Sequence, residues 1–330
     1  MNEQYNNQHK EKYYHDKTTW GNMNKITTGD FKNYQAQKQR QLIKPASTFL
    51  AEAQDILDNG VNLTGDTMPW FHTHDKFRFR EGEVTVWAGV NGNGKSIIMG
   101  QVALWLTKTT SVLIASMEMK GSMTVARMCR QGYGSDKPSP EFYKRFQEDT
   151  DLRLWIYDAT DAVASSDILA MIDWAAEQKF VKHIMIDSLM MCGVNQEDNE
   201  SQKNFMGSLT TKAKQHNIHI HLVAHCRKSP AGVKSHTPSK QDIAGSANIA
   251  NLAFNVIMIH LNEAKVQARK EGEFVDPFDY DGYMIIDKQR NYEFTGMWGF
   301  YYEPDSQQWT DDTPSSLKYN PHNKPLAMAW

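Results

Sequence analysis

"AGVNGNGKSI", residues 88–97, contains a phosphate-binding pattern. Its GVNGNGKS portion fits G-x-x-x-x-G-K-[ST], whereas the G-x-G-x-x-G spacing of a dinucleotide fingerprint is absent. The pattern directly follows an apolar strand-like run, VTVWA (84–88), and it opens a helical stretch, SIIMGQVALWL (96–106). Because the motif requires this strand–loop–helix context, we interpret the segment as a P-loop and not as a structural turn.

The physical chemistry of such a loop predicts that it holds a nucleoside triphosphate. Glycines let backbone N–H groups converge on an anion, and the helix N-terminus adds partial positive charge. Lys95 would reach the terminal phosphates, and Ser96 would ligate Mg²⁺. The expected cofactors are ATP, or another NTP or dNTP, and Mg²⁺. The loop residues expected to bind them are Gly89, Asn91, Gly92, Asn93, Gly94, Lys95 and Ser96.

Two acidic residues follow strand-like runs at positions that suit this chemistry. Asp187 ends HIMID (183–187), where a P-loop protein needs an aspartate that holds Mg²⁺, partly through water. Glu118 lies just beyond SVLIAS (111–116), where a carboxylate could orient an attacking water. Both would face the same carboxyl-end crevice as Lys95. By position alone, Asp187 could also be a cap or turn residue, and Glu118 a surface residue that caps a helix.

The rest of the chain predicts an α/β fold. Strand-like runs alternate with amphipathic stretches, which indicates a mainly parallel sheet with helices on both faces. The last strands have less helix between them, so we expect antiparallel additions at one edge. The expected strands are 84–88, 111–116, 152–158, 183–187, 218–225, 255–260, 283–287 and 298–303, and the clearest amphipathic helices are 165–180 and 201–216.

Composition sets the class of protein and its compartment. The chain has 330 residues, 40% apolar content and a formal net charge of −3, which is less basic than expected of a protein that coats duplex DNA. Its three cysteines form no CxxC pair, and no 18-residue apolar run predicts a membrane span. The N-terminus lacks the apolar region of a secretory signal. We expect a cytoplasmic protein, in the host cytoplasm if a phage encodes it.

The composition also divides the chain. Residues 1–45 form a polar, basic arm, which we expect to be flexible, with a nucleic-acid or neighbour-binding role as the alternative. Residues 46–80 read as a linker with an amphipathic helix near 47–59, which Gly60 ends. The ATPase domain is expected over 81–312, followed by a tail at 313–330 that could contact a partner.

An ordered set of segments resembles the hexameric replicative DNA helicases of the DnaB, Twinkle and phage primase-helicase group. The segments lie within residues 68–303 and are ASMEMK, IMIDSLMM, IHLVAHCRK, DIAGSANIANLAFN and IIDKQRNYEFTG. The resemblance implies a RecA-like core, with Glu118 as catalytic base and His225 as a γ-phosphate sensor. It also implies that Lys288 and Arg290 reach the neighbouring subunit's nucleotide, Arg290 as an arginine finger. Without the family, DKQR would be an exposed charged turn.

The segment after the expected strand 218–225 is the better candidate for DNA contact. It is basic and rich in Ser, Gly and Pro, which suits tracking of a single-strand phosphate backbone, although it could also be a solvated loop. Its cations are Arg227, Lys228, Lys234 and Lys240. The nearby His216, His219 and His221 could suggest zinc, but they lack a carboxylate or cysteine at ligand spacing.

Taken together, the residues and the resemblance predict an ATP-dependent replicative helicase. Such a protein would form a homo-oligomeric, hexameric ring, move 5′ to 3′ on single-stranded DNA and unwind duplex. The alternative is a RecA/RadA-type DNA-dependent ATPase that acts in recombination or as a loader. Residues 1–80 leave no room for a primase module, so we expect a primase or polymerase partner to be encoded separately. Asn255 stands where the family often has Asp.

Overall fold

The computed structural model describes residues 43–59, 64–159, 161–195, 197–227, 237–245, 247–292 and 294–311. The chain divides into two compact units, Met1–Asp58 and Asn59–Trp330. In the first unit, a short 3-10 helix (Ala46–Phe49) runs into helix α3 (Leu50–Asn59), where the sequence predicted a helix. The arm up to residue 42, the residues 60–63 and the tail at 313–330 lie outside the described residues.

The second unit is built on a nine-stranded sheet with the order β3-β2-β4-β5-β1-β6-β7-β8-β9. Strands β1 to β6 pair in parallel, and β7, β8 and β9 add to one edge in antiparallel fashion. The predicted α/β class with a mainly parallel sheet is therefore confirmed. The strands are β1 (Val84–Gly89), β2 (Val112–Ser116), β3 (Leu154–Tyr157), β4 (His183–Asp187), β5 (His219–His225), β6 (Asn255–Leu261), β7 (Gly282–Gln289), β8 (Gly296–Glu303) and β9 (Gln308–Thr310).

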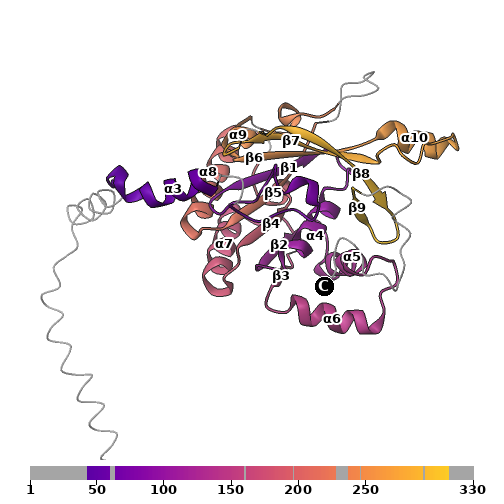
Figure 1. Cartoon of the computed structure of the whole chain (residues 1–330), viewed down its shortest axis with the longest axis horizontal. Coiled ribbons are helices and arrows are strands. Elements are labelled where there is room, and N and C mark those ends of the chain that lie inside the picture. The colour runs from indigo at the N-terminus through magenta and orange to yellow at the C-terminus, as the bar shows by residue number, and fades with distance from the viewer. Residues whose placement is uncertain are drawn as a thin grey trace, which may run out of the picture. The chain divides into compact units, whose positions relative to one another are not determined.

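Helices cover both faces of this sheet (Figure 1). Successive strand residues point to opposite faces, so Val86 of β1 enters one core and Trp87 enters the other. The first core contains side chains of α7 (Ser165–Lys179), α8 (Asn199–His216) and α9 (Ala247–Leu252). The second contains side chains of α4 (Lys95–Leu106), α5 (Gly121–Tyr133) and α6 (Pro140–Thr150). Helix α10 (Glu263–Glu271) lies in the connection from β6 to β7.

The segment 64–80 differs from the expected linker, because its side chains pack into the second core. Met68, Trp70, Phe77 and Phe79 are almost completely buried. A β-bridge between Asp66 and Phe79 closes the segment on itself. The segment is thus part of the second unit, since exposing these side chains would cost several kcal/mol. Among the described residues, no helix is long and apolar enough to cross a membrane.

Candidate active site

A pocket of about 470 Å³ opens beside the P-loop at the carboxyl ends of the parallel strands. The strand register explains its position, because Gly89 at the end of β1 pairs with His225 at the end of β5. Asp187 likewise ends β4 and pairs with Ser116 at the end of β2. On the loop side, the lining includes Asn91, Gly92, Gly94, Lys95 and Ser96. Glu118, Arg127, Asp187, Met190 and His225 also line the pocket.

Glycines shape the P-loop between β1 and α4. A Cβ at Gly89 would meet the carbonyl oxygen of Ile259 at 2.4 Å, so a larger residue cannot be placed there. Gly94 precedes α4 with a φ of 80°, a left-handed conformation that glycine adopts without strain. The buried Lys95 donates from Nζ to the carbonyl oxygens of Gly89 (2.9 Å) and Val90 (3.0 Å). Burial lowers the pKa of this ammonium group, and the nearby charge of the Asp187 carboxylate opposes that shift.

Two of the expected nucleotide-binding residues do not line the pocket. Gly89 lies beneath the loop against Ile259. The side chain of Asn93 is buried and donates to the carbonyl oxygen of Ile259 (3.3 Å). Both residues therefore hold the loop against β6, and the remaining loop residues face the pocket.

Ser96 and Asp187 form the oxygen pair that suits Mg²⁺. Burial raises the pKa of the Asp187 carboxyl, and a hydrogen bond with Ser96 opposes this shift. Hydroxyl and carboxylate oxygens are hard ligands, and Mg²⁺ in such sites takes its other ligands from phosphates and water. In the part of the chain that the structure describes, no group of three or more His, Cys, Asp or Glu side chains is arranged to hold a metal ion. The hydroxyl of Ser96 and the carboxylate of Asp187 thus fit Mg²⁺.

Glu118 lies across the pocket as a charged carboxylate. Its Oε1 atom accepts from the hydroxyl of Ser188 (2.5 Å) and lies 3.4 Å from His225 Nε2. Hydrogen bonding to His225 and then to Ser188 holds the pKa of Glu118 at about 2, although the Ser188 contact is the shorter one. A carboxylate of this kind can accept a proton from, or orient, a water molecule in the pocket.

Arg127 is a pocket residue that sequence reasoning missed. It projects from α5, the helix that begins at Gly121 just after Glu118, and its Nη2 donates to Met119 Sδ (3.2 Å). Burial lowers the pKa of its guanidinium, and the Asp187 charge opposes the shift. Arg127 therefore adds a second cation beside Lys95. The motifs that carry the resemblance do not include Arg127. Its position in a helix that starts at the carboxyl edge of the sheet is the signal that could have located it.

Lys288 and Arg290 lie at the other end of the sheet. Gln289 at the end of β7 pairs with Asn255, which pairs with Thr85 of β1. Strand β1 continues from Thr85 to Gly89, a distance of about 13 Å. The end of β7 is therefore at least this far from the start of the P-loop. These two cations therefore lie far from the pocket of their own chain.

Both cations contact the carboxyl end of α9. Lys288 Nζ donates to carbonyl oxygens of that helix end, namely those of Ala250, Asn251 and Ala253 at 2.8, 2.9 and 2.7 Å. Arg290 Nη2 donates to the Asn251 carbonyl (3.0 Å), and its guanidinium lies 4.9 Å from the centre of the Phe254 ring. The helix end carries partial negative charge, which stabilises both cations. They form a basic edge opposite the P-loop.

The structure describes two of the four residues expected to bind DNA. Arg227 and Lys240 are among the described residues, whereas Lys228 and Lys234 lie outside them. Arg227 donates from its backbone to Asp242 (2.7 Å) and from Nη2 to Gly245 (3.2 Å). Lys240 Nζ lies 3.7 Å from Asp287 Oδ1, so the lysine forms an ion pair within its own chain. The ends of this loop are thus anchored, one of them directly after His225 of the pocket.

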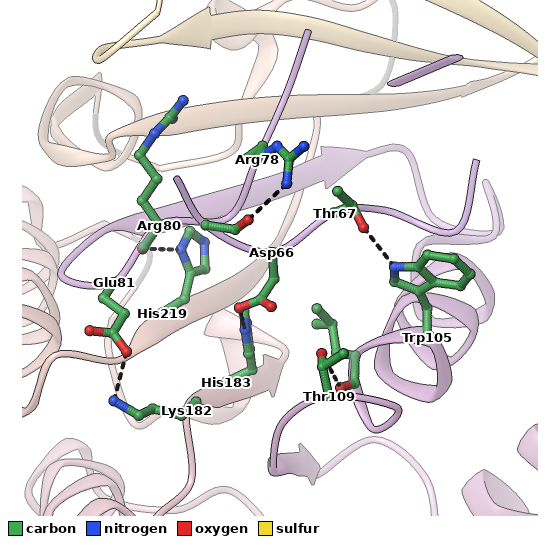
Figure 2. A network of polar contacts seen from close by, with 12 residues as sticks. Asp66, Thr67, Arg78, Arg80, Glu81, Trp105, Thr109, Lys182, His183 and His219 are labelled. Carbon is green, nitrogen blue, oxygen red and sulfur yellow. Dashed lines mark hydrogen bonds and ion pairs between the residues drawn. The ribbon is translucent and has the colours of Figure 1, made fainter. Parts of the chain in front are cut away.

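Two of the neighbouring histidines are structural. His219 donates from Nδ1 to the carbonyl of Arg80 (2.7 Å) (Figure 2). Its Nε2 accepts from the hydroxyl of Thr85 (2.8 Å). His221 accepts at Nδ1 from the indole of Trp87 (3.2 Å). These partners fix neutral tautomers. Burial lowers the pKa of His219 to about 3 and that of His221 well below its usual range.

The same buried cluster extends to the segment 64–80. His183 Nδ1 lies 3.1 Å from His221 Nε2. The Nε2 atom of His183 lies 3.0 Å from Asp66 Oδ2 (Figure 2). His216 is separate from the cluster and contacts Asp173 (2.7 Å). The cluster therefore joins three central strands to that segment.

Comparisons with known proteins agree with this architecture. Residues 75–231 match a family model described as an AAA domain, and no curated protein matches the chain. A solved structure described as an ATPase domain has a TM-score of 0.68 at 12% identity, over 82% of this chain and 99% of that chain. A structure described as a DnaB-like replicative helicase and its interactions with primase has a TM-score of 0.64 at 12% identity, over 81% of this chain and 67% of that chain.

At these identities the likeness establishes the fold. The chain has the RecA-like fold that is seen in the ATPase domains of DnaB-like helicases. The resemblance that the sequence motifs indicated is confirmed at this level.

Proposed function

We propose that the chain is a ring-forming replicative DNA helicase that hydrolyses ATP, or another NTP or dNTP, to move along single-stranded DNA and separate duplex strands. The observation that carries the proposal is the separation of its catalytic groups. Lys95, Glu118 and Asp187 meet at one end of the sheet, whereas Lys288 and Arg290 lie at the other. A site divided in this way is completed when one subunit offers its basic edge to the pocket of the next.

Within the pocket, the side chains divide the chemistry between them. Glu118 orients the attacking water and accepts its proton, while Lys95 and Arg127 stabilise charge on the phosphoryl group. Ser96 and Asp187 would hold Mg²⁺, which neutralises charge on the β- and γ-phosphates when it is bound. Arg290 from the adjacent subunit supplies a further guanidinium, a contribution of about 10³–10⁵ in rate in enzymes that use such a residue.

The position of His225 supports the proposed movement along DNA. This residue lines the pocket and ends β5, and the basic loop begins directly after it. Loss of the γ-phosphate would move His225, and this movement would be passed directly to the basic loop. Arg227, Lys228, Lys234 and Lys240 would track the phosphate backbone without reading its sequence.

The wider assignments rest on the DnaB-like resemblance. It supports a hexameric ring, movement 5′ to 3′, a cytoplasmic setting and a separately encoded primase or polymerase as partner. The solved DnaB-like structure, whose description includes interactions with primase, is consistent with that partner. Helix α3 would contact a neighbouring subunit through its exposed Leu50 and Leu57.

A forked duplex with a 5′ single-stranded tail tests the proposal. We expect strand separation that requires ATP and Mg²⁺, together with hydrolysis that single-stranded DNA stimulates. Lys95→Ala should abolish both, whereas Lys144→Ala, which removes an exposed lysine of α6, should change neither. DNA-stimulated hydrolysis without strand separation would instead indicate a RecA/RadA-type recombinase or loader. An absence of hydrolysis in the wild-type protein would reject both assignments.

A further inference from the structure

Ser188 is a buried residue whose hydroxyl serves the pocket. It follows Asp187 at the end of β4 and has no exposed surface. The residue precedes a short 3-10 helix (Leu189–Met191), and serine at such a position commonly accepts a backbone N–H of the helix. Here its side chain makes no capping hydrogen bond. The hydroxyl is directed to Glu118 Oε1 at 2.5 Å.

The two contacts of Glu118 fall on the same oxygen atom. Ser188 Oγ and His225 Nε2 both approach Oε1, at 2.5 and 3.4 Å. Oε2 makes no hydrogen bond or ion pair with the described residues, and Glu118 lines the pocket with its side chain 39% exposed. The arrangement fixes one carboxylate oxygen and leaves the other for a molecule in the pocket. An exposed glutamate without such contacts samples several rotamers.

We propose that Ser188 is a positioning residue for nucleotide hydrolysis, which anchors Oε1 of Glu118 so that Oε2 accepts the hydrogen of the attacking water. The inference rests on the proposed function, because it assumes that Glu118 is the base. Ser188 itself contacts neither the nucleotide nor the water. Its hydroxyl donates to the carboxylate and retains its proton, and the water's proton passes to Oε2.

Ser188→Ala removes the anchor and leaves the backbone unchanged. We expect kcat for ATP hydrolysis to fall roughly ten- to a hundredfold, because a misplaced base loses the near-attack geometry. The KM and the affinity for nucleotide should stay the same, since Ser188 is absent from the pocket lining. Ser116→Ala is the matched control: it removes a buried hydroxyl one strand away that accepts from Thr124 (3.0 Å), and it should leave kcat unchanged.

A pH profile separates positioning from general loss of packing. The hydrogen bond with His225, then that with Ser188, and the nearby Lys95 charge all lower the pKa of Glu118, so losing the Ser188 bond raises this pKa. The acid limb of kcat should therefore move to higher pH in Ser188→Ala. Ser188→Cys, which keeps the shape and donates weakly, should lie between the variant and the wild type. If Ser188→Ala does not fold, the serine-to-cysteine change carries the test alone through the same shift in the acid limb.

A double variant decides whether Ser188 acts through Glu118. In a Glu118→Gln background, Ser188→Ala should cause no further fall in kcat, because the group that it positions is already gone. Independent, multiplicative losses would overturn the inference, as would a Ser188→Ala enzyme with the kcat and pH profile of Ser116→Ala. Failure of the proposed function looks different, since Glu118→Gln would then hydrolyse ATP as fast as the wild type.

Discussion

Lys95 and Arg290 lie at opposite ends of the same sheet. Lys95 begins α4 beyond the carboxyl end of β1, whereas Arg290 follows β7 beside Asn255 at the amino end of β6. The backbone N–H of Arg290 donates to Phe254, which keeps the residue at that end. One chain therefore cannot bring both cations to one triphosphate. The fold presents a pocket on one side and a basic edge on the other.

The pH dependence of hydrolysis should report on that basic edge. Burial lowers the pKa of Lys288 to about 8, so the ammonium is charged below this pH and becomes neutral as the pH rises through it. If its charge assists a neighbouring pocket, kcat should fall above pH 8. Lys288→Arg keeps the charge at alkaline pH, so the fall should disappear when kcat is measured from pH 7 to 10.

Lys108→Arg provides the control for this profile. Burial also lowers the pKa of Lys108, but this residue lies over the Trp105 ring, and its carbonyl accepts from Arg153 just before β3, on the far side of the sheet from β7. The alkaline fall should persist in that variant. An alkaline fall that persists unchanged in Lys288→Arg would contradict a role for the lysine charge.

Asn255→Asp tests the residue at which the chain departs from the helicase pattern. Asn255 is buried and donates from Nδ2 to Glu83 (2.9 Å) and to the hydroxyl of Thr85 (3.0 Å). Aspartate would remove that donor and place a second carboxylate beside a buried one. We expect the free energy of unfolding to fall by about 2–4 kcal/mol at pH 7.5.

Urea denaturation at pH 7.5 and 5.5 measures this effect. Part of the lost stability should return at the lower pH, because protonation of one carboxyl group relieves the repulsion. Asn204→Asp, which places a carboxylate at an exposed position of α8, should leave the unfolding midpoint almost unchanged. Equal stability of Asn255→Asp and the wild type at both pH values would show that this interaction is misjudged.

The buried histidines predict that the protein loses stability in acid. The pKa of His219 is about 3 in the folded chain, against an ordinary value of 6.5, so between these values the unfolded chain binds a proton that the folded chain does not. Stability should therefore decline as pH falls from 6.5 toward 3, by about 1.4 kcal/mol per pH unit for one such group. His219→Gln, which does not titrate, should make the decline shallower in urea titrations. An unchanged slope would count against the buried, neutral imidazole.

Much of the fold could be predicted because it rests on regular patterns. Buried parallel strands appear as short apolar runs, and the predicted 183–187 coincides with β4. Helices with a broad apolar stripe were also predicted, as for α7. Helices that bury few apolar residues gave no comparable signal: α6 buries only Phe146 and Thr150, and α10 buries only Lys265. The segment 64–80 is irregular, so its burial depends on tertiary packing and leaves no helical or strand periodicity in the sequence.

The residues of the candidate site also fall into those that a sequence pattern predicts and those that depend on tertiary packing. Lys95 and Asp187 could be located from a motif and a strand end, because parallel strands bring their carboxyl ends together. Arg127 and Ser188 could not, since their part in the pocket depends on how α5 packs and on the direction of one hydroxyl. The side-chain contact of Asn93 could not be predicted for a related reason. The motif gives its place in the loop but not its bond to Ile259.

The most direct test of a pocket shared between subunits is complementation between two inactive variants. Arg290→Ala keeps its own pocket, and Glu118→Gln keeps its basic edge. Each alone should hydrolyse ATP at least roughly 10³-fold more slowly than the wild type. When the two are mixed and reassembled, DNA-stimulated hydrolysis should reappear, because some pockets then receive both groups. A mixture that hydrolyses no faster than the sum of its parts, or an Arg290→Ala protein that is fully active alone, would contradict the account.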